Sequence, residues 1–274
     1  MKIYRLFISI CIVLFCLSLF FYYKVYEENQ LIDNFIIESV DKQFATDTQN
    51  IAISLATAIY YGTKKVISGD ELDWYDTLET KYLLPASLVH LTAGVSLKYQ
   101  GYGVAGQQNL GPCATMSRVL LNALWRLDIP ARELLLLNNA QGKGGGHVMV
   151  EFFDGGRWLV ISPADTAHIW KNRRGEIATA AEIKQDPEIF KQIYEIRPNY
   201  DYLLDNYKNI SFEDFPHFIP KIIKFTLGVE SFDKLESPKL YHRPRMLLFY
   251  ISAGLCLMFG VLAIIAKNKD SKRL

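Results

Sequence analysis

The sequence predicts an α+β domain flanked by two transmembrane helices. Two apolar segments without charged residues, 6–23 and 246–266, lie near the ends of the 274-residue chain. Between them, apolar residues with a helical period follow Cys113, and two short apolar runs are joined by an Asp-Gly turn signal at Asp154. The roughly 220 residues between the apolar segments are enough for one domain with a substantial core.

Each apolar segment is about as long as the ~20 residues that a helix needs to cross a bilayer. A cleaved signal peptide is the alternative for the first segment, but its apolar core usually has ~7–15 residues and precedes a small-residue cleavage site. Here the run is longer and ends in aromatic residues that suit a membrane interface: Phe20, Phe21, Tyr22 and Tyr23. We therefore expect an uncleaved anchor, and the lipid bilayer as a partner of both segments.

Two spans place both termini on the same side of the membrane. The basic residues of segments 1–5 and 267–274 predict that this side is the cytoplasm. The central domain of this two-pass cell-membrane protein is then extracytoplasmic. The alternative, a cytoplasmic domain with a reduced thiol, remains open. The net charge of +1 gives no indication of a nucleic-acid partner.

Cys113 is the one cysteine outside the apolar segments, and the other three lie within them: Cys11, Cys16 and Cys256. It has no disulfide partner in its own domain, so it is either a small buried residue or a reactive thiol. Apolar residues recur with helical spacing over 116–127, and Pro112 suits the start of a helix. Cys113 is therefore expected in a first helical turn, where backbone N–H groups and the helix dipole favour a thiolate.

Other polar residues of interest lie before and after this helix. Gln107 and Gln108 precede the cysteine and are candidate oxyanion donors, with an ordinary polar loop as the alternative. The apolar run 131–137 predicts a buried strand. His147 begins the first strand of the predicted hairpin, beside a glycine-rich loop, and from there it can reach a ligand or a thiol.

In order and spacing, these elements resemble the transglutaminase-like superfamily of cysteine enzymes. The matching motifs are Gly111-Pro112-Cys113, Leu127 to Arg132, His147 with Glu151, Asp154 to Trp158, and Ser162-Pro163. The resemblance covers roughly residues 107–166 and implies a papain-like fold, in which the nucleophile helix packs on an antiparallel sheet. It also implies cleavage or exchange of amide bonds through a thioester. No cofactor is expected, and no spacing of cysteine, histidine and aspartate indicates a zinc site.

Matched position by position, Cys113 corresponds to the family's nucleophile and His147 to its base. The family's usual aspartate is replaced by Ser162. Three interpretations remain open: Ser162 orients the imidazole, Asp165 replaces the carboxylate, or the site is degenerate and the domain binds rather than cleaves. Structural roles are expected for four further side chains: an ion pair of Glu151 with an arginine, a surface position for His168, and core positions for Trp125 and Trp158.

We expect a cysteine hydrolase, protease or acyltransferase that acts on peptides, proteins or cell-envelope polymers. The alternative is a degenerate domain that assembles or binds a membrane complex for envelope or polysaccharide export. The terminal segments 1–5 and 267–274 lie outside the two spans. The chain between the spans divides into three parts: a helical stalk and N-terminal part (24–98), the transglutaminase-like core (99–170), and a helical, aromatic-rich extension (171–245). In the extension, 178–194 is expected to be helical, and the aromatic stretch 199–225, broken by Pro216 and Pro220, is expected near the membrane.

Overall fold

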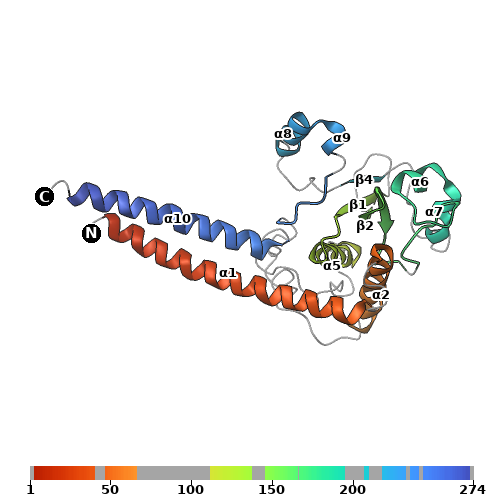
Figure 1. Ribbon diagram of the computed structural model, residues 1–274, viewed down its shortest axis with the longest axis horizontal. Coiled ribbons are helices and arrows are strands. Elements are labelled where there is room, and N and C mark those ends of the chain that lie inside the picture. The colour runs from red at the N-terminus through yellow and green to blue at the C-terminus, as the bar shows by residue number, and fades with distance from the viewer. Residues whose placement is uncertain are drawn as a thin grey trace. The chain divides into compact units, whose positions relative to one another are not determined.

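The computed structural model (Figure 1) describes residues 3–40, 47–66, 112–137, 146–165, 167–194, 207–209, 218–232, 235–240 and 243–271. The chain divides into two compact units. The described part of one unit consists of residues up to Leu31 and from Leu240 onward. The described residues from Ile32 to Lys239 form the other unit, which is the domain.

The first unit contains two long apolar helices, α1 (Ile3–Ser39) and α10 (Pro244–Ser271). Both are long and apolar enough to cross a membrane, and few residues of their most apolar windows are buried. They run side by side in opposite directions (Figure 1), with the ring of Phe7 6.0 Å from that of Phe259. The predicted spans lie within these helices, and α1 continues without a break beyond the predicted end of its span into the domain.

The domain is α+β, as predicted. Its helices are α2 (Thr48–Val66), α5 (Pro112–Arg126), α6 (Ala180–Gln185), α7 (Pro187–Tyr194), α8 (Phe218–Leu227) and α9 (Val229–Phe232). Its strands are β1 (Ala131–Leu137), β2 (Gly146–Asp154), β3 (Arg157–Ile161) and β4 (Tyr207–Asn209). They form an antiparallel sheet in the order β3-β2-β1-β4, with the three-residue β4 at one edge.

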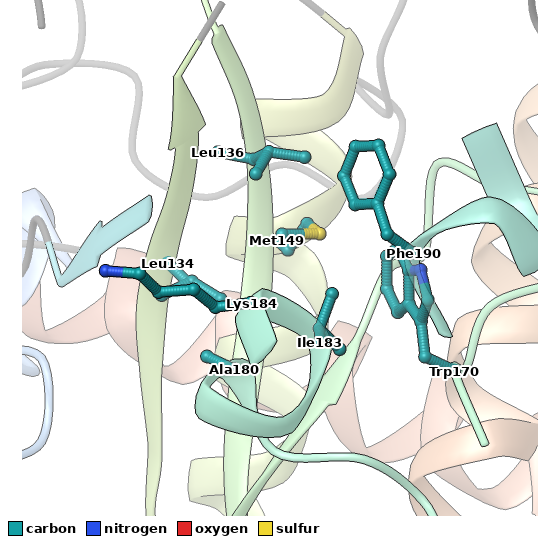
Figure 2. Close-up of a pocket in the computed structure, with 8 residues that line it drawn as sticks. All are labelled: Leu134, Leu136, Met149, Trp170, Ala180, Ile183, Lys184 and Phe190. Carbon is teal, nitrogen blue, oxygen red and sulfur yellow. The ribbon is translucent and has the colours of Figure 1, made fainter. Parts of the chain in front are cut away.

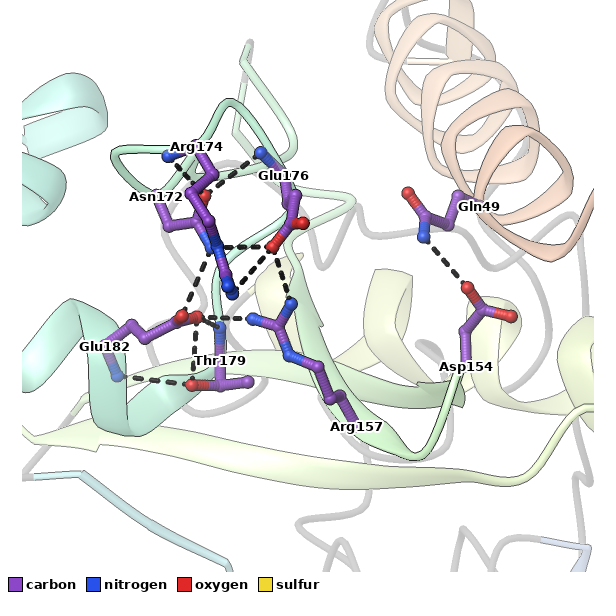
Figure 3. A network of polar contacts seen from close by, with 8 residues as sticks. All are labelled: Gln49, Asp154, Arg157, Asn172, Arg174, Glu176, Thr179 and Glu182. Carbon is purple, nitrogen blue, oxygen red and sulfur yellow. Dashed lines mark hydrogen bonds and ion pairs between the residues drawn. The ribbon is translucent and has the colours of Figure 1, made fainter.

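The β2–β3 hairpin was predicted from its turn signal. Gly155 and Gly156 are the two turn residues, with φ values of 54° and 81°. Positive φ at both positions is what a two-residue turn needs to match the twist of its strands, and glycine adopts it without steric cost. The side chain of Gln49 on α2 donates a 2.9 Å hydrogen bond to Asp154, which links this helix to the turn (Figure 3).

Alternating side chains give the sheet two buried faces. Val150 and Phe152 of β2 belong to a core with buried residues of α2 and α5, such as Leu55 and Leu120. The opposite face, which includes Met149, belongs to a second core with buried residues of α6 and α7. Because strand residues alternate between faces, Glu151 shares the face of Met149. Since Leu55 of α2 lies in the first core, this helix is part of the domain core and not only of a stalk.

A polar network joins β3 to the segment before α6 (Figure 3). Arg157 of β3 donates hydrogen bonds to Glu176 (2.9 Å) and Glu182 (2.7 Å). Asn172 donates to the same two carboxylates, and Thr179 caps α6 in a reciprocal pair with Glu182. A capping box of this kind satisfies backbone donors at a helix start, so the network fixes where α6 begins.

Glu151 forms the predicted ion pair with Arg132, at 2.6 Å, and the carboxylate is almost fully buried. The Arg132 guanidinium also lies 4.3 Å from the ring centroid of Trp158. This tryptophan is half-buried under the arginine, so the prediction of a core position is wrong for Trp158 but confirmed for Trp125.

The C-terminal extension is helical over most of 178–194. This segment forms the two helices α6 and α7, because Pro187 disfavours a helical conformation at Asp186, which is extended (φ −124°, ψ 102°). Pro220 lies in the first turn of α8, where its missing N–H removes no intrahelical hydrogen bond. Pro216 lies outside the described residues.

Candidate functional site

Cys113 is the second residue of α5 and is half-buried. Pro112 begins the helix, as predicted, since it has no N–H that a first-turn position would leave unpaired. The buried apolar side of α5, including Leu120 and Leu124, packs in the core with β2. Ser117 donates a 3.0 Å hydrogen bond to the backbone oxygen of Val148 on that strand. These contacts hold the start of α5 against the start of β2.

His147 is the second residue of β2 and pairs with Leu136 of β1. Its side chain is buried, with 6% of its surface exposed. The Nε2 atom lies 2.8 Å from Oδ2 of Asp165 and 3.1 Å from Oγ of Ser162. Both partners are fully buried, and the Ser162 hydroxyl donates a 2.7 Å hydrogen bond to the same Asp165 oxygen. Nε2 therefore faces a carboxylate that is itself supported by a hydroxyl.

The Cys113 side chain is a further hydrogen-bond partner of His147. Because Asp165 and Ser162 occupy Nε2, Nδ1 is the ring nitrogen left to face the sulfur. The imidazole thus lies between a thiol and a carboxylate. In this arrangement a proton on the ring can be shared with the sulfur on one side while the carboxylate stabilises the ring charge on the other.

Three influences act on the charge of His147. Burial opposes the positive charge and lowers the pKa of His147, but the hydrogen bonds with Asp165 and Cys113 outweigh burial and raise that pKa from 6.5 to about 9. The imidazole is therefore protonated at neutral pH. A protonated ring beside a thiol favours the thiolate form of the sulfur, which is the nucleophilic form.

A second histidine holds the turn that carries Ser162 and Asp165. His168 donates from Nδ1 to the carbonyl oxygen of Ser162 (3.1 Å), and its own carbonyl accepts the Ser162 N–H (2.7 Å). The His168 N–H reaches the carbonyl of Asp165 (3.3 Å), and the ring meets that of Tyr60 edge-on. His168 is buried and has a positive φ of 53°, so the predicted surface position is wrong. Burial lowers the pKa of His168, which keeps its imidazole neutral at neutral pH.

An apolar pocket, partly open to solvent, lies on the face of the sheet that Met149 occupies, and its floor includes Leu136 and Met149 (Figure 2). Leu136 is the cross-strand partner of His147, and Met149 is two residues along β2. Trp170, Ile183 and Phe190 form its sides. The residues that line this pocket include neither His147 nor Cys113, so it is not part of the site that these two residues form.

The four candidate catalytic residues thus lie together in the structure: Cys113, His147, Ser162 and Asp165. Gln107 and Gln108, the candidate oxyanion donors, lie outside the described residues. No sequence pattern pointed to Tyr60, and only the closeness of His168 to Ser162 and Asp165 in the sequence could have suggested His168. Among the described residues, no group of three or more His, Cys, Asp or Glu side chains is arranged to hold a metal ion.

No family model, curated protein or solved structure significantly matches this chain. The chemistry proposed for the site therefore rests on its own geometry and on the motifs in the sequence.

Proposed function

We propose that this chain is a membrane-anchored cysteine hydrolase or acyltransferase of the transglutaminase-like type. The observation that carries the proposal is the position of the His147 ring, with Asp165 and Ser162 at Nε2 and Cys113 as its other partner. A thiol, an imidazole and an orienting carboxylate in this order are the groups that nucleophilic acyl transfer needs.

In the proposed reaction, the Cys113 thiolate attacks the carbonyl carbon of an amide and forms a C–S bond. The resulting tetrahedral oxyanion collapses as the C–N bond breaks, and the His147 imidazolium gives its proton to the leaving amine. The products of this half-reaction are a free amine, a thioester on Cys113 and a neutral imidazole. Neutral His147 then takes a proton from water or from an acceptor amine, which attacks the thioester and releases an acid or a new amide together with the thiolate.

Asp165 takes the role of the orienting carboxylate in this proposal, and Ser162 fills the position where the family usually has aspartate. The negative charge of Asp165 stabilises the imidazolium, while the Ser162 hydroxyl fixes the direction of the carboxylate. Complete burial of both side chains strengthens these interactions, because water does not compete for them.

The substrates we propose are peptides, proteins or cell-envelope polymers, the classes that the resemblance implies. A p-nitrophenyl ester of an N-acylated amino acid is a suitable activated probe, because its leaving group departs without a proton and a nucleophilic thiolate is then sufficient for acylation. On mixing with the detergent-solubilised full chain, we expect the intact mass of the protein to rise by one acyl group, and the mass to map to Cys113.

The controls for this acylation separate the proposal from incidental labelling. Cys113→Ser should remove the added mass, whereas Cys16→Ser should keep it, because Cys16 is an exposed cysteine of the apolar helix α1. Absence of acylation in the wild-type chain across esters with apolar, small and charged acyl groups would argue for the degenerate binding domain instead.

We also propose that the domain is extracytoplasmic and that both termini are cytoplasmic. The two apolar helices and the basic terminal segments support this orientation. An Arg173→Cys substitution in a chain whose native cysteines are changed to serine provides the test, because the Arg173 side chain is 85% exposed. A membrane-impermeant maleimide should label this cysteine in intact cells, and labelling only after the membrane is opened would reverse the orientation.

A further inference from the structure

The helix α8 exposes its apolar residues to an unusual degree. None of its ten residues is buried. Phe225 is 91% exposed, Phe218 61% and Ile222 57%. Positions i, i+4 and i+7 lie on the same side of a helix, so these three side chains form one stripe. Single exposed apolar residues are common on protein surfaces, but a contiguous apolar stripe on one helix indicates a binding surface.

Basic side chains border this stripe. Lys221 and Lys224 are both exposed, and each lies within one turn of Phe225. Beyond the glycine turn at Gly228, the short helix α9 adds an exposed apolar residue, Val229. The Lys224 ammonium lies 4.6 Å from the ring centroid of Phe232, a cation–π contact between α8 and α9.

This combination of residues fits the surface of a lipid bilayer. A helix with aromatic and aliphatic side chains on one side and lysines beside them inserts its apolar side among the acyl chains, while the lysines bind anionic headgroups. The same chain carries two helices long and apolar enough to span a membrane. The second of these begins at Pro244, only twelve residues after Phe232, the end of α9. Twelve residues reach at most about 40 Å, so little chain separates α9 from the start of this apolar helix.

We propose that α8 is an interfacial helix that lies along the membrane surface, with Phe218, Ile222 and Phe225 inserted below the headgroups. The partner is a bilayer that contains anionic lipid, and the contact is additional to the two spanning helices. This inference is independent of the thiol chemistry, because no residue of α8 belongs to the site around His147.

The test places an environment-sensitive NBD fluorophore at one of two positions of α8 in the full chain. The native cysteines are first changed to serine, and the label is attached to Phe225→Cys or, as the matched control, to Leu227→Cys. Both positions are exposed, but they point about 200° apart around the helix. The chain is reconstituted into phosphatidylcholine vesicles with or without phosphatidylglycerol, and quenching by nitroxide-labelled lipids is compared with quenching by aqueous iodide.

We expect the label at residue 225 to be quenched by nitroxide lipids and protected from iodide, and the label at residue 227 to show the opposite. Changing Lys221 and Lys224 to glutamate should lower the equilibrium constant for insertion of α8 into the anionic bilayer on the order of tenfold or more. The loss is measured as reduced nitroxide quenching of the label at residue 225. Equal access of iodide to both labels would overturn the proposal. Protection of the label at residue 225 without nitroxide quenching would also overturn it, because a protein surface, such as a second copy of this chain, would then cover the stripe.

Discussion

Replacing Asp165 with asparagine is expected to lower the rate of Cys113 acylation by on the order of 10²- to 10⁴-fold. The amide has nearly the same shape as the carboxylate but carries no charge to stabilise the imidazolium. Its NH₂ group also donates a hydrogen bond where the His147 Nε2 needs an acceptor. The rate of p-nitrophenol release from the ester probe measures the effect.

Ser162→Ala should have a smaller effect, about fivefold to tenfold, because it removes one neutral hydrogen bond and leaves the Asp165 charge in place. Asp154→Asn is the matched control, since this carboxylate lies in the β2–β3 turn and bonds only peripherally to Gln49 among its described contacts. It should leave the rate unchanged. If the Asp165→Asn variant had the melting temperature of the wild type and also acylated Cys113 at the wild-type rate, Asp165 would have no orienting role.

The elements around the site could be predicted from the sequence because each has a strong local signal. The helical apolar period after Cys113, with Pro112 at its start, predicted α5. The Asp-Gly signal between two apolar runs predicted the hairpin and placed His147 at the start of its first strand. The structure contains these elements because the tertiary packing favours the same conformations as the local sequence does.

The partners of His147 were harder to predict, because they depend on how the chain turns after β3. Ser162 lies at the position that the motif predicts, but Asp165 reaches the ring only because the segment from Ser162 to His168 curls back. That turn is closed by an isolated bridge between Ile161 and Ile169 and by the bonds of His168. A buried histidine with positive φ has no local sequence signal, since its conformation is set by tertiary contacts with the turn and Tyr60.

The second large effect expected is on the pH dependence of the thiol. The pKa of His147 is raised, so the imidazolium persists through neutral pH and is lost only as the pH rises through about 9. The contribution of the protonated His147 and its partners to folding stability depends on pH in the same direction. It is fully present below pH 6.5, the ordinary pKa of histidine, and is lost as the pH rises through about 9. Over the neutral range, Cys113 should therefore react as a thiolate paired with imidazolium.

Without His147, only the start of the helix favours ionisation of the Cys113 thiol. The pH dependence of its reactivity should then resemble that of an ordinary cysteine, which ionises near pH ~8.5. The expected difference is largest at acidic pH. Near pH ~6 the wild-type chain should be alkylated on the order of tenfold to a hundredfold faster than His147→Ala, even though a more stable thiolate is a somewhat weaker nucleophile.

The measurement that tests the proposed site most directly is the rate of Cys113 alkylation by iodoacetamide as a function of pH, in the wild type and in His147→Ala. The other three cysteines are changed to serine in both chains, so that only Cys113 reacts. We predict a wild-type rate that is already high in mildly acidic solution, and a mutant rate that rises only near the ordinary thiol range. Identical profiles for the two chains would contradict a thiolate–imidazolium pair, and with it the proposal that Cys113 is an activated nucleophile.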